Sequence, residues 1–216
     1  MLFNRHRDLE GKHAILSASS WRWINDDETS LTKRICSQYL PTVGTILHEM
    51  ACRHIRYRVL IEDNDKKNVI LELLSNGIPK VVIESIDMDA MFDNFRAYVN
   101  DCVMLKMEPE VVLCYSDNCF GTTDAIKFSE EERLLRINDY KSGTTPAHME
   151  QLLIYAALFC LEYRIDPYTI DTKLRIYQNN DILYGNPTSD EIRDTMDTII
   201  VHDNLTNHIK RGGYTS

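Results

Sequence analysis

The chain has 216 residues, of which 44% are hydrophobic and 26% are charged. This composition fits one globular domain and excludes a disordered chain. The formal net charge of −9 argues against a protein that coats DNA through charge alone, because phosphate binding depends on Lys and Arg. No apolar run approaches the roughly 20 residues of a membrane-spanning helix, and no signal peptide follows the basic start, so we expect a cytoplasmic protein.

The first part of the chain, about residues 13–106, is expected to be helical. A serine at position 17, 19 or 20 could cap a short helix that carries Trp21 and Trp23. A longer helix is predicted to begin between Pro41 and Thr45 and to run to about Leu60, since its apolar residues recur at helical spacing.

Two more helices are predicted before the first strand. A short apolar helix over residues 69–74 should end at Asn76-Gly77, a pair that breaks helices. Asp87 or Asp89 can then cap a long helix that continues to about Leu105.

The second part, about residues 110–178, is expected to form a small mixed sheet. Thr145 at the N-cap and Pro146 at the first position predict a helix that runs to about Tyr163 and is buried against the sheet. A capping box at Thr188–Glu191 predicts a last helix over about 188–211. The strands are predicted at 110–115, 120–128, 133–141 and 172–178. The result is a single α/β domain of layered helices and strands over residues 1–216.

Two carboxylates and a lysine fall together at the end of this predicted sheet. Asp139 and Lys141 share one face of their strand, because side chains alternate along a strand. If this strand and the preceding one form a hairpin that turns between residues 131 and 132, Asp124 lies opposite Asp139. Opposed carboxylates repel each other unless a cation lies between them, which predicts a divalent metal such as Mg²⁺. Lys141 could then orient the attacking water or stabilise charge on a phosphate.

Each residue has a plainer interpretation on its own. Gln151 and Tyr155 lie four positions apart on one helix face, where both could contact a phosphate or a base, or could be a solvated residue and a core aromatic. Asp124 alone is typical of a turn, and His48 alone is typical of a satisfied core or surface histidine. The order of the motifs is more informative than any single member.

Taken together, the motifs resemble the RecB-like branch of the PD-(D/E)XK nuclease superfamily. The resemblance spans roughly Lys12 to Tyr163, and it implies a restriction-endonuclease-like core. The opening from His13 to Ser19 is similar to the start of phage-encoded relatives. The four ordered motifs are Gly44-Thr45-Ile46-Leu47-His48, Gly121-Thr122-Thr123-Asp124, Asp139-Tyr140-Lys141 and Gln151-Leu152-Leu153-Ile154-Tyr155.

The resemblance implies roles for these residues. His48, Asp124, Asp139 and the Tyr140 carbonyl would hold Mg²⁺, with Mn²⁺ as a substitute. Asp124, Asp139 and Lys141 would be catalytic, while Gln151 and Tyr155 would support the site and contact DNA. The acidic residue that often follows the histidine by one turn is replaced by Cys52.

The six cysteines carry a separate expectation. Some relatives hold an iron–sulfur cluster with late cysteines, whereas the last cysteine here is Cys160. We therefore expect no cluster and interpret the cysteines as buried, reduced thiols.

The resulting prediction is a metal-dependent deoxyribonuclease of phage-type DNA recombination, with exonuclease action as the expected mode and a bacterial cytoplasm as its location. A single-strand annealing protein is a candidate partner, and a ring-shaped homo-oligomer would fit processive action. Two alternatives remain open at this stage. One is a non-catalytic DNA-binding or scaffold module that retains the fold, and the other is a metallohydrolase for small nucleotides, which would need a closed pocket.

Overall fold

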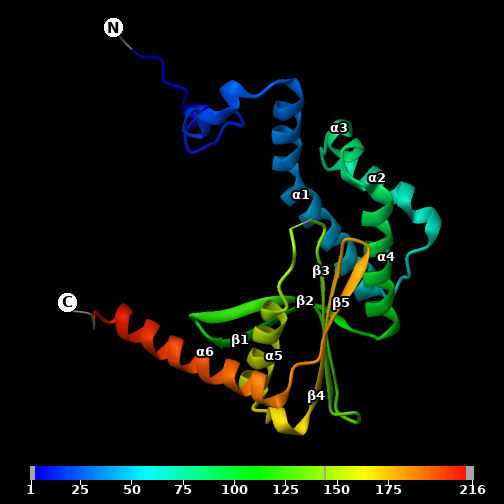
Figure 1. Cartoon of the computed structure of the whole chain (residues 1–216), viewed down its shortest axis with the longest axis vertical. Helices are drawn as coiled ribbons and strands as arrows, with labels where there is room; N and C mark the ends of the chain where they lie inside the picture. Colours follow the sequence, from blue (N-terminus) through cyan, green and yellow to red (C-terminus); the bar gives the residue numbers. More distant parts are fainter. Residues whose placement is uncertain (1–2, 144, 213–216) are drawn as a thin grey trace.

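In a computed structural model, which describes residues 3–143 and 145–212, five strands form one mixed sheet in the order β1-β2-β3-β4-β5 (Figure 1). Strands β3 and β4 pair in parallel, and the other neighbours are antiparallel. The expected α/β class with a small mixed sheet is therefore confirmed. The strands are β1 (Glu108–Ser116), β2 (Cys119–Ser129), β3 (Leu134–Tyr140), β4 (Asp171–Gln178) and β5 (Asp181–Gly185).

Helices cover both faces of the sheet, and each face has its own hydrophobic core. One core joins α1, α2, α3 and α4 to Ala125, Tyr140 and Tyr177 of the sheet. The other joins α5 and α6 to the face that carries Leu135 and Ile137. The α-helices are α1 (Glu28–Tyr57), α2 (Lys66–Ser75), α3 (Lys80–Glu84), α4 (Met88–Met104), α5 (Glu150–Tyr163) and α6 (Ser189–Lys210). Short 3-10 helices occur at Arg7–Leu9, Ala18–Asn25, Asp63–Asp65 and Pro167–Thr169.

Helix α1 begins well before the predicted start near Pro41. The Asp27 side chain accepts a hydrogen bond from the Ser30 backbone N–H at 2.7 Å and so caps the helix at residue 28. Pro41 lies inside the helix, although an interior proline lacks the N–H of one helical bond and costs about 3 kcal/mol. Thr45 Oγ1 donates to the Pro41 carbonyl at 3.1 Å. The predicted start near Pro41 was wrong. Proline favours the first turn of a helix, but the Asp27 cap starts this helix further upstream.

The other N-terminal helices agree with the sequence prediction except for α3, which was missed. Helix α2 ends at a C-cap at Asn76. Asp87, rather than Asp89, caps α4 by accepting from the Ala90 N–H at 3.1 Å. The short helix with Trp21 is present, but the side chain of its N-cap residue, Ser17, makes no capping hydrogen bond to the helix backbone.

The pairing of β2 with β3 confirms the predicted hairpin. Ala125 pairs with Asn138 and Ile126 with Ile137, so the hairpin turns midway between residues 131 and 132. Strand β5 was missed, because it is a short edge strand after the Asn179-Asn180 turn.

Helix α5 begins at Glu150, four residues later than the predicted first position, Pro146. The segment before it is a loop held by Gln178 at the end of β4. The Gln178 side chain donates to the carbonyls of Gly143 at 2.6 Å and Thr145 at 2.8 Å, and it accepts from the Ala147 N–H at 3.0 Å. These tertiary hydrogen bonds override the local helix signal. As predicted, α5 ends at Tyr163 and is buried against the sheet.

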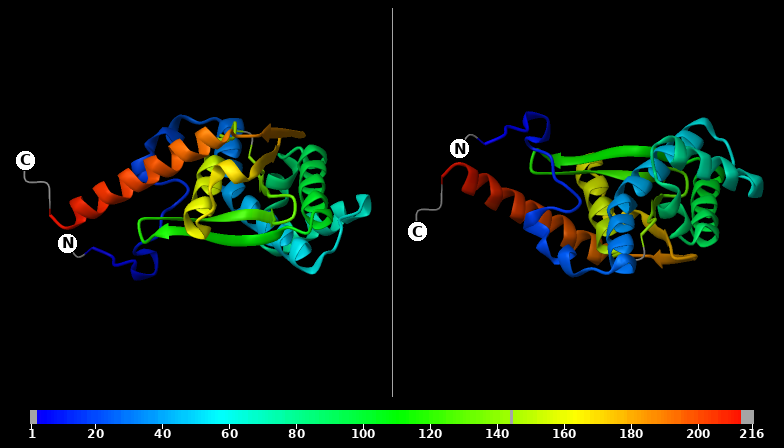
Figure 2. Two further views of the ribbon diagram at one scale, coloured as in Figure 1. Left: turned by 90° about the horizontal axis from the view of Figure 1, so that it is seen from below. Right: turned by 90° about the horizontal axis from the view of Figure 1, so that it is seen from above.

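Helix α6 has the predicted capping box, in which Thr188 and Glu191 bond each other's backbone N–H groups. Its last turns extend beyond the sheet in both views of Figure 2. There Asp203 contacts the β1–β2 turn, where it accepts from Asn118 Nδ2 at 2.8 Å.

No helix in residues 3–143 or 145–212 is long and apolar enough to cross a membrane.

Only half of the cysteines are buried as predicted. Cys36, Cys102 and Cys160 are buried, whereas Cys52 and Cys119 are half-buried and Cys114 is exposed.

Candidate carboxylate–lysine active site

Asp124 of β2 and Asp139 of β3 come together just beyond Ala125 and Asn138, the last pair of residues in the β2–β3 hairpin. The Asp124 Oδ2 atom accepts a hydrogen bond from the Tyr140 backbone N–H at 2.9 Å. Asp124 belongs to the Gly-x-x-Asp motif and Tyr140 to the Asp-Tyr-Lys motif, so one bond joins the two motifs. The Asp139 side chain is only 3% exposed, and that of Asp124 is 18% exposed. The predicted apposition of the two carboxylates is therefore present in the fold.

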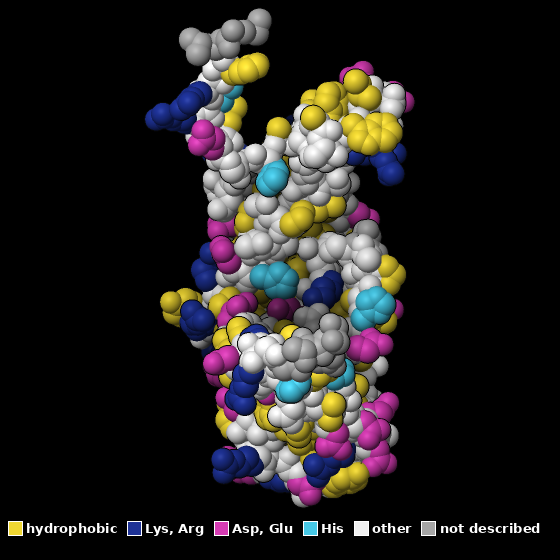
Figure 3. Space-filling model, turned by 90° about the vertical axis from the view of Figure 1, so that its left-hand side faces the viewer, with side chains coloured by type: hydrophobic (Ala, Val, Ile, Leu, Met, Phe, Trp, Pro, Cys, Tyr) yellow, Lys and Arg dark blue, Asp and Glu magenta, His cyan; other side chains and the backbone are white. Residues whose placement is uncertain are grey.

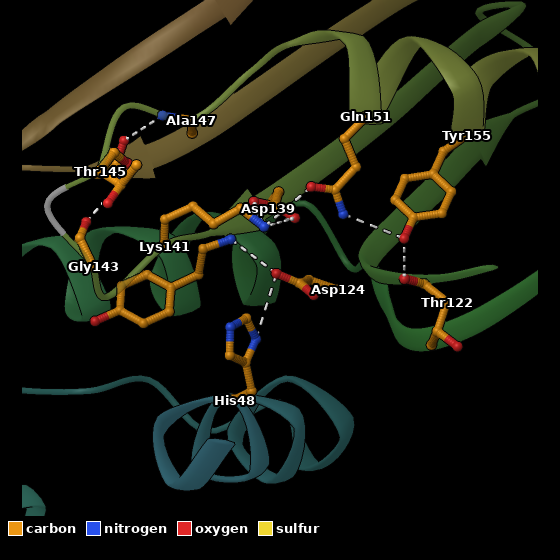
Figure 4. Close-up of polar contacts among 12 residues, drawn as sticks. His48, Thr122, Asp124, Asp139, Lys141, Gly143, Thr145, Ala147, Gln151 and Tyr155 are labelled. Carbon is orange, nitrogen blue, oxygen red and sulfur yellow. Dashed lines mark hydrogen bonds and ion pairs between the residues drawn. The ribbon is translucent and has the colours of Figure 1, made fainter. Parts of the chain in front are cut away.

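A chain of polar contacts then runs from Asp139 to helix α5 (Figure 4). Lys141 Nζ lies 3.0 Å from Asp139 Oδ2 and donates to Gln151 Oε1 at 3.2 Å. Gln151 Nε2 donates to the Tyr155 hydroxyl at 3.4 Å, and this hydroxyl donates to the Thr122 carbonyl at 2.7 Å. Gln151 of α5 thus holds the Lys141 side chain from one side, and Asp139 of β3 holds it from the other.

His48 reaches the same place from α1, which is far away in the sequence. Its Nδ1 atom lies 3.4 Å from Asp124 Oδ2, and its ring packs edge-on against the Tyr140 ring with centroids 5.7 Å apart. Burial lowers the pKa of His48, and the nearby Asp139 carboxylate only partly offsets this effect. The imidazole is therefore neutral at neutral pH, which is the form that binds metals.

An open groove of about 800 Å³ leads to these residues. Its lining includes His48, Asp124 and Lys141 together with Thr45 and Glu49 of α1. The space-filling view shows a hollow in this face in which histidine, lysine and acidic side chains gather (Figure 3). The groove has more carboxylates than cations along its lining, so a polyanion needs an added positive charge to enter it.

The two aspartates resist ionisation in the metal-free protein. Burial raises the pKa of Asp124 to about 6, against the ordinary value of 3.8. Burial raises the pKa of Asp139 to about 7, and repulsion from Asp124 acts in the same direction. Lys141 opposes both effects but does not cancel them. A bound divalent cation would remove this repulsion.

The donor set fits a hard divalent cation. Among the described residues, the buried Asp139 Oδ2 forms an ion pair with Lys141 Nζ at 3.0 Å but no well-formed hydrogen bond, so it keeps an acceptor position for a cation. Carboxylate oxygens suit Mg²⁺, and one imidazole makes Mn²⁺ acceptable. Within residues 3–143 and 145–212, no group of three or more His, Cys, Asp or Glu side chains is arranged so that it could hold a metal ion. The expected metal ligands are thus close to one another but do not form a complete coordination site; they are His48, Asp124, Asp139 and the Tyr140 backbone.

The two motif glycines lie at close approaches between elements. A Cβ atom at Gly121 would be 2.9 Å from Cε1 of Tyr155, and one at Gly44 would be 3.0 Å from Oγ of Ser142. The missing side chains let α5 approach β2 and let α1 approach the segment after Lys141. This explains why glycine stands in both motifs.

Glu110 is a groove residue that sequence reasoning missed. Pro109 pairs with Ala125 and Val111 with Thr123, so Glu110 lies across from Asp124. It has a φ of 57°, in the left-handed region, and this kink interrupts the β1–β2 pairing. A predicted hairpin of β1 and β2 centred on Asp117 would have placed Glu110 opposite Asp124. The hairpin of β2 and β3 placed Asp124 opposite Asp139 in the same way.

The fold and the site define an α/β domain with a carboxylate–lysine centre in an open groove. The chain belongs to the family described as protein of unknown function (DUF2800), which matches residues 13–178. No curated protein and no solved structure matches the chain.

Proposed function

We propose that this protein is a metal-dependent deoxyribonuclease that hydrolyses DNA phosphodiester bonds. The observation that carries the proposal is the position of Lys141, 3.0 Å from the buried Asp139 carboxylate and in the groove that also exposes Asp124. A carboxylate pair beside a single ammonium supplies the two features that phosphodiester hydrolysis needs, a cation site and a fixed positive charge at the phosphate.

His48, Asp124, Asp139 and the Tyr140 carbonyl would hold Mg²⁺ or Mn²⁺, which when bound lowers the pKa of water and offsets negative charge on the phosphate. The Lys141 side chain would donate to the phosphate oxygen or to the attacking water. Gln151 keeps Lys141 in place through its 3.2 Å contact. Tyr155 anchors Gln151 to the Thr122 carbonyl and thereby to β2.

The proposal includes a restriction-endonuclease-like core of the PD-(D/E)XK superfamily, in its RecB-like branch. The order of the four motifs supports it, as does the contact between the Asp124 and Tyr140 motifs. Exonuclease action in phage-type recombination, an annealing-protein partner and a homo-oligomer belong to the same proposal. The open groove favours a strand over a free nucleotide, since small-nucleotide sites enclose most of their ligand.

The test uses end-labelled linear and circular DNA with the full-length protein in Mg²⁺, Mn²⁺ or EDTA. We expect cleavage only with a metal, and cleavage of linear but not circular DNA if the enzyme acts from ends. Metal-independent cleavage would contradict the mechanism. DNA binding without cleavage under every condition would support the scaffold alternative instead.

A further inference from the structure

A second cavity adjoins the candidate active site and shares Lys141 with the groove. It has a volume of about 290 Å³, and its walls come from the start of α4, from Ser142 after β3 and from Asn179 in the β4–β5 turn. The groove, in contrast, is lined by α1, β1 and β2. We call this second space the side cavity. Both spaces are lined by Lys141, so a group in the side cavity lies beside the residue proposed to contact the reacting phosphate.

Two polar side chains that line the side cavity make no side-chain hydrogen bond to the residues that the structure describes. Asn94 of α4 is 6% exposed and lines the cavity. Within residues 3–143 and 145–212, its amide makes no side-chain hydrogen bond. Tyr140 also lines the cavity, and its buried hydroxyl has no partner among those residues. The Asn94 amide is therefore available to a ligand in the side cavity that offers it hydrogen bonds.

The remaining walls are apolar. Ile86, Ala90 and Met91 line the side cavity, and Met91 is buried. A ligand that matches these walls has flat apolar faces and a polar edge. The volume lies at the lower end of the range of about 300–1,000 Å³ typical of small-molecule sites. It therefore suits one heterocyclic ring system rather than a length of strand.

The charges disfavour a phosphate as the occupant. Lys141 is the cation that lines the side cavity, and it already contacts Asp139 and Gln151. Asp87 adds a carboxylate to the wall. A neutral ring with hydrogen-bonding edges meets no repulsion there, and Asn amides are suited to the edges of bases.

We propose that the side cavity receives the nucleobase next to the scissile phosphate, turned out of its stack while Asn94 bonds its edge. This inference rests on the proposed nuclease function. Enzymes that act on nucleic acid extrude bases into pockets of this chemistry, with apolar walls and groups that read the base edge. The site would hold the strand in register at the reacting phosphate and would favour substrates with a base at that position.

The experiment uses DNA with 2-aminopurine at single positions near the cleaved end, in Ca²⁺ to limit cleavage. Anisotropy measures binding, and 2-aminopurine fluorescence reports loss of stacking. For the wild-type protein we expect fluorescence to rise at one position when the DNA is bound. Asn94→Leu and Ala90→Leu should bind DNA but lose this rise. Asp93→Leu, which adds the same side chain at an exposed neighbouring position, should retain it.

A second readout is cleavage of DNA with an abasic site at that position. The wild-type enzyme should be slowed about tenfold or more relative to intact DNA, since the base contact is lost. Asn94→Leu should lose most of this difference. Binding and metal-dependent cleavage with no fluorescence rise at any position, and with equal rates on abasic DNA, would overturn the side-cavity proposal alone. Neither binding nor cleavage would overturn the nuclease function and this inference with it.

Discussion

The Tyr140 backbone N–H donates to the Asp124 carboxylate at 2.9 Å, and this bond ties the end of β3 to the middle of β2. Tyr140 lies between Asp139 and Lys141, so the bond sets the position of all three residues relative to Asp124. The ring of Tyr140 is meanwhile buried against Phe95, Tyr98 and His48. One residue therefore connects both carboxylates, the lysine and the α1 histidine to the core.

The first prediction concerns Lys141→Ala. We expect a loss of about 100-fold or more in the cleavage rate, because removal of one donor that stabilises transition-state charge typically has this effect. DNA affinity should change little. The matched control is Lys173→Ala, which removes an exposed lysine from β4. Single-turnover cleavage with saturating enzyme separates rate from binding, and full activity of Lys141→Ala would exclude the proposed role.

The second prediction concerns stability in EDTA as the pH changes. The pKa of Asp139 is raised from 3.8 to about 7 in the folded protein, so the folded state holds this proton more tightly than the unfolded chain. The free energy of unfolding should therefore fall as the pH rises from about 4 to about 7, by on the order of 2 kcal/mol. Asp139→Asn should flatten this slope and be more stable than the wild type at pH 8.

Urea unfolding at a series of pH values measures this effect, with Asp171→Asn as the control. Asp171 is exposed at the start of the neighbouring strand β4. If Asp139→Asn had the same pH slope as the wild type, repulsion and burial at Asp139 would not be the cause of the slope.

The third prediction concerns metal binding. Mg²⁺ or Mn²⁺ should raise the melting temperature more at pH 8 than at pH 5.5, because binding requires the ionised forms of two carboxylates whose pKa values burial raises. EDTA should reverse the shift. The double variant Asp124→Asn, Asp139→Asn should show none, and a shift of equal size in that variant would place the metal elsewhere.

The fourth prediction concerns the close approach of Gly121 to Tyr155. In Gly121→Ala the new Cβ would lie 2.9 Å from the Tyr155 ring, which must move and release its bond to the Thr122 carbonyl. We expect a loss of about 1–2 kcal/mol in unfolding free energy. Adding Tyr155→Leu should remove this extra cost in a double-mutant cycle. Gly143→Ala, whose Cβ would have open space around it, should be nearly neutral.

The fifth prediction concerns Gln178, whose side chain holds the loop before α5. Gln178→Leu removes bonds to Gly143, Thr145 and Ala147, so amide hydrogens in residues 145–149 should exchange faster. The cleavage rate should fall, while the amide hydrogens of Asp139 and of the strands should remain protected from exchange. Gln38→Leu, at an exposed position of α1, is the control. Unchanged exchange in this loop would show that these bonds do not hold it.

Local chemistry allowed the sequence to predict much of the fold. The alternation of β2 and β3 and their short turn define the register, so the apposition of Asp124 with Asp139 was predictable from residue numbers. The capping box at Thr188 likewise predicted the start of α6. Such features depend on residues a few positions apart, and a single sequence contains them in full.

Features that depend on distant residues were not predictable in this way. Thr145-Pro146 is a good helix start in isolation, but the Gln178 side chain forms hydrogen bonds with the Thr145 carbonyl and the Ala147 N–H and holds that segment as a loop. Glu110 enters the groove because β1 pairs with β2 about an axis at Asp117, which the sequence prediction did not use. The side cavity needs Asn94, Ser142 and Asn179 in one place, and no spacing in the sequence indicates this.

The parallel pairing of β3 with β4 has a consequence for how the protein is made. A parallel neighbour can be reached only after a long crossover, here through α5. All the candidate catalytic residues therefore leave the ribosome before the strand that carries Gln178. A nascent chain should acquire an ordered carboxylate–lysine centre only when β4 has been synthesised and has paired, at a stage when the sheet is nearly complete.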